Sequence, residues 1–281
     1  MQDKKALRLY LIIVLSVSAV IEAVWIYLGE AASLAGISTL LMMVPFITAA
    51  IVGRIYYKKQ RAMGFKRCRF VHVLLSILIP LIYLMLSYAL FWLFTGSYNG
   101  HPSALMDAAA AYSGHELPKN VAIAISLAVT LPVSFITALG EEAGWRGLMH
   151  PIMHRIWGWK KAIIISGCVW ALWHLPIVVA GLYYPSEISL VYVIPMFIVE
   201  IAALTIILSW LRMASGSVWP AVILHAVHNY LDQIVFQSFT SNENSVYYVG
   251  EIGIITLSLT VIAAVIILVK GRKAFTLSLD S

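Results

Sequence analysis

Charged residues are scarce in this chain. Only 11% of its 281 residues are Asp, Glu, Lys or Arg, whereas 61% are hydrophobic. Soluble globular domains contain about 25% charged and about 45–50% apolar residues. The composition therefore excludes an ordinary soluble domain and predicts a protein that crosses a membrane several times.

Cysteine is nearly absent as well. The two cysteines, Cys68 and Cys168, cannot form the disulfide framework of a small secreted protein. The chain also has no internal repeat, a feature that many transporters show as two related halves.

Apolar runs of about 20 residues, the length that crosses a bilayer as a helix, recur along the sequence. These runs predict an all-α polytopic membrane protein, a bundle of about eight transmembrane helices. Since no linker separates them, we expect residues 1–281 to form a single integral-membrane domain. The runs lie at 7–28, 33–56, 71–94, 121–141, 162–182, 189–211, 218–237 and 250–269.

Basic residues predict the orientation, because cytoplasmic loops of membrane proteins are enriched in Lys and Arg. With eight spans, every Lys and Arg except Lys119 falls on the side of the two termini. We therefore expect both termini in the cytoplasm and a multi-pass location in the plasma membrane. The net charge of +6 then reflects topology and contact with an anionic inner leaflet, not nucleic acid. The densest basic stretch is the loop 58–70.

Charged groups within a bilayer are costly, so those that occur there are functional candidates. Glu141 and Glu142 stand side by side, and Glu142 is followed four residues later by Arg146. This spacing places Glu142 and Arg146 on one helical face in the favourable order for an ion pair. Glu141 is turned about 100° away and is left free for proton transfer.

Two further groups of polar residues follow at helical spacing. Trp170 lies one turn before His174, where we expect its ring to stack beside the imidazole and limit its rotamers. His225 and Asn229 are again four residues apart, so both point one way from their helix. His228 is turned about 60° from that face and is interpreted as supporting or structural.

Some polar residues remain without a predicted role. Glu22 and Glu200 belong to no group, and either could pair across the bundle. His150 and His154 fall in the stretch between the fourth and fifth spans, where we expect them to face lipid headgroups.

Acid, imidazole and amide at similar depth can build a hydrolytic site. Hydrolysis needs a base that deprotonates water and donors that stabilise the oxyanion. Glu141 could be the base, with its water shared with His174, and His225 and Asn229 could be the donors. Alternatively, Glu141, His174 and His225 could bind zinc with an open position for water. Neither HExxH nor its reverse occurs, so no contiguous metal motif supports the zinc alternative.

The three groups resemble the motifs of the CAAX-protease and bacteriocin-processing family (CPBP, or Abi), which includes the Ras-converting CAAX endopeptidase. The family motifs are Glu-Glu-x-x-x-Arg, aromatic-x-x-x-His and His-x-x-x-Asn. In this chain they read EEAGWR from Glu141, WALWH from Trp170 and HAVHN from His225. The motifs lie within a core of about residues 121–237, and none is matched in the first three spans.

This resemblance implies an intramembrane endopeptidase whose cavity opens toward the cytoplasm and the inner leaflet. By carry-over from the motifs, Glu141 and His174 activate water, and His225 and Asn229 stabilise the oxyanion. Glu142, Arg146 and Trp170 support them. Such families have been described both as zinc enzymes and as metal-independent ones, so the cofactor is either zinc or none.

The expected substrates are prenylated CAAX tails or precursors of peptide pheromones and bacteriocins. A non-catalytic immunity protein that binds a membrane peptide is one alternative. A proton-coupled transporter that uses Glu141, Glu142 and His174 as a relay is another.

Overall fold

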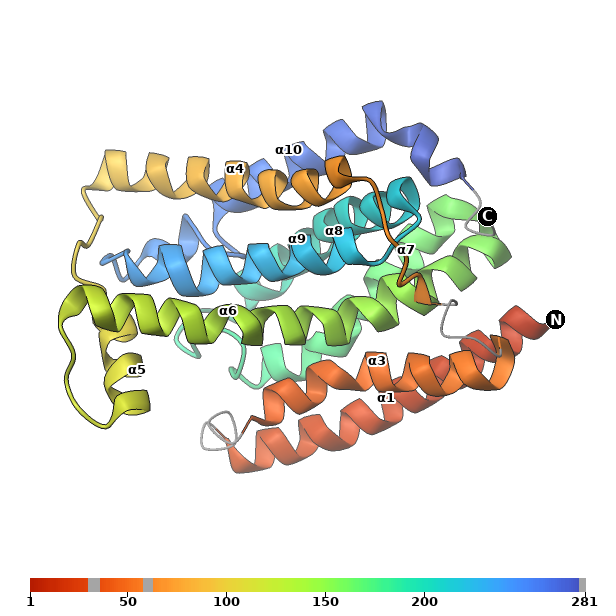
Figure 1. The fold of residues 1–281 in the computed structure, drawn as a ribbon, viewed down its shortest axis with the longest axis horizontal. Helices are drawn as coiled ribbons and strands as arrows, with labels where there is room; N and C mark the ends of the chain where they lie inside the picture. The colour runs from red at the N-terminus through yellow and green to blue at the C-terminus, as the bar shows by residue number, and fades with distance from the viewer. Residues whose placement is uncertain (30–35, 58–62, 278–281) are drawn as a thin grey trace.

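The computed structural model describes residues 1–29, 36–57 and 63–277, and these residues contain no β-strand. Long helices run along a common direction and form a bundle, while one short helix caps an end of it (Figure 1). The helices are α1 (Gln2–Leu28), α3 (Ile37–Tyr57), α4 (Phe70–Thr95), α5 (Ser103–Ser113), α6 (Lys119–Gly144), α7 (His150–Val179), α8 (Leu190–Ser215), α9 (Trp219–Asn229) and α10 (Ile254–Lys270).

The all-α membrane fold predicted from the sequence is confirmed. Within the described residues, five helical stretches are long and apolar enough to cross a membrane, and α10 is a shorter apolar helix. Seven of the eight predicted spans fall on these helices, and the span 218–237 falls on α9 and the π-helical residues 230–236 that follow it. Residues 33–35 of the second span lie outside the described residues. Helix α5 was not predicted, because its residues read as part of a polar loop.

The fourth and fifth spans belong to one uninterrupted helical stretch, Lys119–Val179. Its direction changes at Gly158, where φ is 76° and ψ is 165°. This backbone conformation is open to glycine and strained for residues with a Cβ. Gly158 therefore allows the chain to turn back and cross the bundle a second time.

Two π-helical segments continue the helices that carry the motifs. Trp145–Met149 follows α6 directly, and Tyr230–Phe236 follows α9 directly. Single π-helical turns inside α-helices are rare and frequently lie at functional sites. Here each one begins within a few residues of a predicted site residue, Glu142 in one case and Asn229 in the other.

Helix α6 occupies a central place in the bundle, where α3 packs against one side of it and α9 against the other (Figure 1). Behind them α7 packs against α8, and α8 packs against α10. The residues of the three motifs thus come from α6, α7 and α9.

The two ends of the described chain lie at the same end of the bundle (Figure 1). Near the N-terminus, Asp3 pairs with Arg155, with Nε and Oδ2 2.8 Å apart. Near the C-terminus, the carbonyl oxygen of Phe275 lies 2.8 Å from Nε2 of His154. This agrees with an even number of membrane crossings.

Close packing of α3 on α6 depends on glycine. A Cβ added at Gly140 would collide with the carbonyl oxygen of Met42, and one at Gly144 would collide with Pro45. Small residues at such positions let helix backbones approach closely within a membrane. These two glycines flank Glu141 and Glu142, so the packing fixes the position of both carboxylates relative to α3.

We expect Gly140→Ala to destabilise the protein, because the added methyl group meets the backbone of α3. Overpacking of this kind costs about 1–3 kcal/mol. The control is Gly53→Ala on α3, where an added Cβ meets no atom within 4 Å. Thermal unfolding of the purified protein in detergent checks this, and equal midpoints for the two variants would contradict it.

Candidate active site

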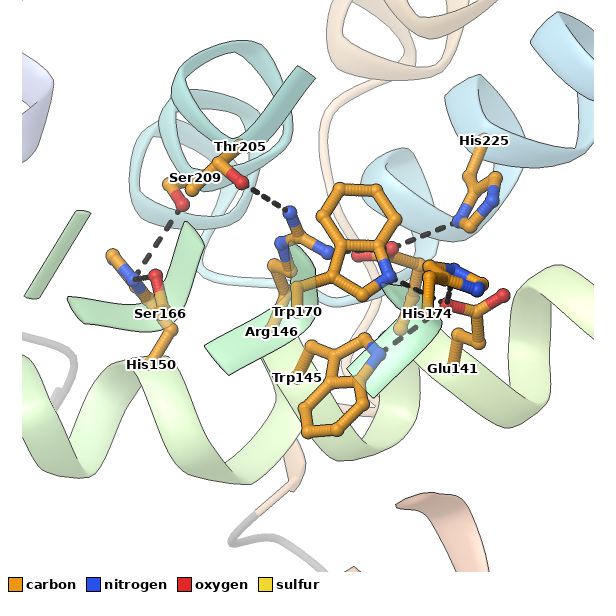
Figure 2. A network of polar contacts seen from close by, with 11 residues as sticks. Glu141, Trp145, Arg146, His150, Ser166, Trp170, His174, Thr205, Ser209 and His225 are labelled. Atoms are coloured by element: carbon orange, nitrogen blue, oxygen red, sulfur yellow. Dashed lines mark hydrogen bonds and ion pairs between the residues drawn. The ribbon is translucent and has the colours of Figure 1, made fainter. Parts of the chain in front are cut away.

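Glu141 is a buried carboxylate surrounded by hydrogen-bond donors. Its Oε2 accepts from the indole nitrogen of Trp170 at 2.7 Å and from that of Trp145 at 3.3 Å. The same oxygen lies 3.6 Å from Nε2 of His174 (Figure 2). Two neutral indoles thus donate to this carboxylate, and no lysine or arginine within the described residues forms an ion pair with it.

Glu142 is shared between a helix neighbour and a distant helix. Its Oε1 accepts a hydrogen bond from Nη1 of Arg146 at 2.8 Å, which confirms the predicted ion pair. The same oxygen lies 2.9 Å from Nδ1 of His225 on α9. Nη2 of Arg146 also lies 3.3 Å from Oγ1 of Thr205 on α8. Glu142 and Arg146 therefore connect α6, α8 and α9, a link that the sequence spacing did not reveal.

The contact with Glu142 fixes the proton on His225. Because a carboxylate only accepts, Nδ1 of His225 must carry the hydrogen. Nε2 can then donate a hydrogen bond only when the imidazole is protonated. With Arg146 and a protonated His225, the two adjacent carboxylates would have two cationic partners in a buried site where unpaired charge is costly.

Aromatic side chains surround His174. Its ring makes T-shaped contacts with Trp173, Tyr183 and Phe197, at centroid distances of 4.6, 5.3 and 6.0 Å. Nδ1 of His174 is buried without a hydrogen-bond partner. These contacts restrict the ring and leave its Nε2 directed at Glu141.

Trp170 acts differently from the prediction. Its ring is tilted 48° to His174 at 6.2 Å, so the two do not stack. Instead its indole donates to Glu141, and the guanidinium of Arg146 lies 4.2 Å over its ring. The prediction considered only the shape of the indole ring and not its N–H group, which is a hydrogen-bond donor.

Two cavities adjoin these residues. A small one of about 20 Å³ is lined by His174, His225 and Asn229, among others. A space of this size holds about one water molecule. A large pocket of about 1050 Å³ is lined by Glu141 and Asn229 and continues to loop residues 182–188 and 242–252. The pocket is large enough for several residues of a peptide.

The large pocket opens at the end of the bundle opposite to the basic residues. Its lining includes Ser38 at the start of α3 and the loops before α8 and before α10. The basic residues cluster at the other end, where Arg155 contacts Asp3. Residues 58–62 of the basic loop 58–70 lie outside the described residues. From the sequence we expected both the basic end of the bundle and the opening of the cavity to face the cytoplasm. Because the two lie at opposite ends of the bundle, only one of these predictions can be correct.

The alternative zinc set does not come together in this structure. The two imidazoles contact different carboxylates, His174 facing Glu141 and His225 facing Glu142. Among the described residues, the ligand atoms of Glu141, His174 and His225 do not all lie within 4.8 Å of one another. The arrangement does not fit a shared zinc ion, and we derive no step through one.

Three residues that the motifs did not explain are buried. The expectation that His150 faces headgroups is wrong, because it is fully buried with Nδ1 3.2 Å from Oγ of Ser166 (Figure 2). Glu22 and Glu200 are also buried, at 4% and 2% exposure. Glu200 lines the small cavity.

The fold and the site together define an all-α membrane protein with a buried cluster of carboxylates, imidazoles and an amide. Residues 123–231 match the family model described as type II CAAX prenyl endopeptidase Rce1-like. Over 106 residues the chain is 32% identical to a protein of Methanococcus maripaludis described as CAAX prenyl protease 2. The segment that carries the three motifs is thus similar to type II CAAX prenyl endopeptidases, in agreement with the predicted resemblance to the CPBP family. The alignment covers 35% of this chain and 39% of that relative.

Glu142→Gln should lower both the folded yield and the melting temperature. The amide would leave the buried Arg146 without its carboxylate, and breaking a buried pair in this way costs about 3–5 kcal/mol. Yield in the membrane fraction and thermal unfolding in detergent measure the effect.

Two variants serve as controls for this prediction. Asp3→Asn removes one partner of a partly exposed pair, so it should cost no more than about 1 kcal/mol. Combining Glu142→Gln with Arg146→Met removes the unpaired charge and should recover part of the loss. A normal yield and melting temperature for Glu142→Gln alone would contradict a structural role of the pair.

Proposed function

We propose that this protein is a membrane-embedded endopeptidase in which Glu141 activates the attacking water. The observation that carries the proposal is the position of Glu141, which lines the large pocket while its Oε2 faces His174. His174, His225 and Asn229 line the adjoining small cavity. The base thus lines the large pocket, while a restrained imidazole and two potential oxyanion donors line the water-sized cavity beside it.

The proposed reaction needs no other group. Glu141 takes a proton from water, whose oxygen attacks the carbonyl carbon of the scissile peptide bond. Nε2 of protonated His225 and the amide of Asn229 donate to the developing oxyanion. The tetrahedral intermediate collapses, the carbon–nitrogen bond breaks, and Glu141 returns the proton to the leaving amine. A carboxylic acid and an amine are released.

His174 has a positioning role in this scheme. Its Nε2 faces the oxygen of Glu141 that the indoles already occupy, and it lines the water-sized cavity. It can therefore hold the attacking water beside the base. Glu142 keeps the proton of His225 on Nδ1. Nε2 of His225 therefore donates a hydrogen bond only when the imidazole is cationic.

The direction of the pocket bears on the substrate. Under the positive-inside rule, the end with the basic residues is cytoplasmic, and the pocket then opens on the outer side. An outward opening favours peptides exported across the membrane, such as pheromone or bacteriocin precursors. A cytoplasmic opening favours prenylated tails, the substrates that the name of the relative indicates. We infer the outward opening, because the sorting of basic residues is nearly complete.

The proteolytic proposal is tested by reconstitution with a farnesylated CAAX peptide and a panel of leader peptides. We expect Glu141→Gln and His225→Ala to reduce cleavage about 10²–10⁴-fold, the usual contribution of acid–base groups. Glu116→Gln, an exposed carboxylate in the loop after α5, is the control. Cleavage by Glu141→Gln at the wild-type rate would overturn the assignment. Binding without cleavage of any peptide would favour the immunity-protein alternative.

The outward opening is tested by cysteine labelling in intact cells. In a background of Cys68→Ser and Cys168→Ser, Glu243→Cys lies by the pocket and Lys160→Cys lies near the turn at Gly158. A membrane-impermeant maleimide should label the first in intact cells and the second only after permeabilisation. The reverse result would place the opening in the cytoplasm.

A further inference from the structure

A second buried polar cluster lies beside the proposed active site and takes no part in the reaction described above. His228 and Asp232 are four residues apart at the junction of α9 with its π-helical extension, and Glu251 lies in the loop before α10. One ligand atom from each side chain lies within 4.8 Å of the other two. His228 and Asp232 are fully buried, and the side chain of Glu251 is 10% exposed.

Each of these three side chains is held by the hydroxyl of a tyrosine. Such contacts orient metal ligands, since ligating imidazoles and carboxylates are usually fixed through their other polar atom. The contacts are Tyr83 Oη to His228 Nδ1 at 2.6 Å, Tyr88 Oη to Asp232 Oδ1 at 2.8 Å, and Tyr184 Oη to Glu251 Oε2 at 2.9 Å.

The ligand atoms that lie close together are those that the tyrosine hydroxyls do not contact. Nε2 of His228 and Oδ2 of Asp232 are buried, and neither has a hydrogen-bond partner among the residues that the structure describes. Oε1 of Glu251 lies 3.9 Å from Nε2 of His228 and accepts from Gln233 at 2.8 Å. A carboxylate oxygen has a second lone pair, so this hydrogen bond leaves Glu251 able to coordinate a cation.

The two carboxylates of the cluster have no permanently cationic partner in the described part of the chain. Among the described residues, neither Asp232 nor Glu251 forms an ion pair with a lysine or arginine. Glu200 is also buried, forms no ion pair with another described residue, and lines the small cavity together with Glu251. Buried carboxylates without a compensating charge are costly. A divalent cation would balance two of them.

We propose that His228, Asp232 and Glu251 bind a divalent transition-metal ion, with zinc and manganese as the fitting candidates. One imidazole and two carboxylates form a set that suits these ions. Ligand atoms about 2.0–2.2 Å from a tetrahedral ion lie about 3.4 Å apart, so the side chains need to close by roughly an ångström. Glu251 also lines the large pocket, which provides an entry path and an open position for water.

None of the three ligands belongs to the reacting group, so the metal proposal does not rest on the proposed proteolysis. The site would join α9 to the loop before α10, and it would be supported by α4 through Tyr83 and Tyr88. An ion that binds only the folded protein raises its stability by mass action. Metal content and thermal stability therefore report on it without any activity measurement.

The test uses the purified full chain in detergent, stripped with a chelator and then dialysed against zinc or manganese chloride. We expect about one ion per chain by elemental analysis and a melting temperature several degrees higher. Calcium chloride is the control ion, since calcium takes six to eight oxygen ligands and is a poor match to this set. Asp232→Asn and Glu251→Gln should each lose the ion and the shift.

Two further variants make the result specific. Tyr88→Phe keeps all three ligands but releases Asp232, so we expect about 10–100-fold weaker binding. Glu141→Ala should retain the ion. Loss of the ion in Glu141→Ala would place it in the Glu141–His174–His225 set and overturn the proposal.

The proposal also fails if wild-type protein binds neither ion, or if it binds as much metal as Asp232→Asn and Glu251→Gln do.

Discussion

The site depends on one buried carboxylate oxygen. Oε1 of Glu142 lies 2.8 Å from a nitrogen of Arg146 and 2.9 Å from Nδ1 of His225, so it joins two elements far apart in the chain. Burying this group is costly, and the cost is offset only while both partners stay in place. Close packing of α6 on α3 through Gly140 sets the height of Glu142, and Thr205 anchors Arg146 to α8. The orientation of α9 that brings His225 to this oxygen also places Asn229 beside the small cavity that His225 lines.

The adjacent glutamates have separate surroundings for a geometric reason. Neighbouring residues on a helix point about 100° apart, so Glu141 faces α7 while Glu142 faces Arg146 and α9. Indole and imidazole nitrogens surround Glu141, and a guanidinium contacts Glu142. Neutral donors stabilise a carboxylate without holding it in a salt bridge, which leaves it able to accept and return a proton. The aromatic residues of α7 thus do more than fill space, since Trp170 connects both glutamates through its N–H and its ring.

Local spacing in the sequence predicted the features that a single helix determines. The spans, the Glu142–Arg146 pair and the common face of His225 and Asn229 follow from hydrophobic runs and the helical period. Features that depend on the relative rotation of helices could not be predicted in this way. The contact of His225 with Glu142 and the burial of His150 both arise where α6 or α7 meets another helix. The π-helical turns after α6 and α9 also escaped, because one extra residue per turn leaves no distinct mark in an apolar sequence.

Two adjacent tyrosines connect the proposed active site to the second polar cluster. Tyr183 makes a T-shaped contact with His174 at 5.3 Å, and the hydroxyl of Tyr184 donates to Glu251 at 2.9 Å. Their rings lie 4.8 Å apart in the short loop between α7 and α8. This loop also lines the large pocket. A cation bound to Glu251 would hold Tyr184, and through it the loop, against the bundle. Tyr183 would then be held against the imidazole of His174. Occupancy of the second cluster would in this way restrict the ring that faces Glu141, without any contact between the ion and the reacting groups.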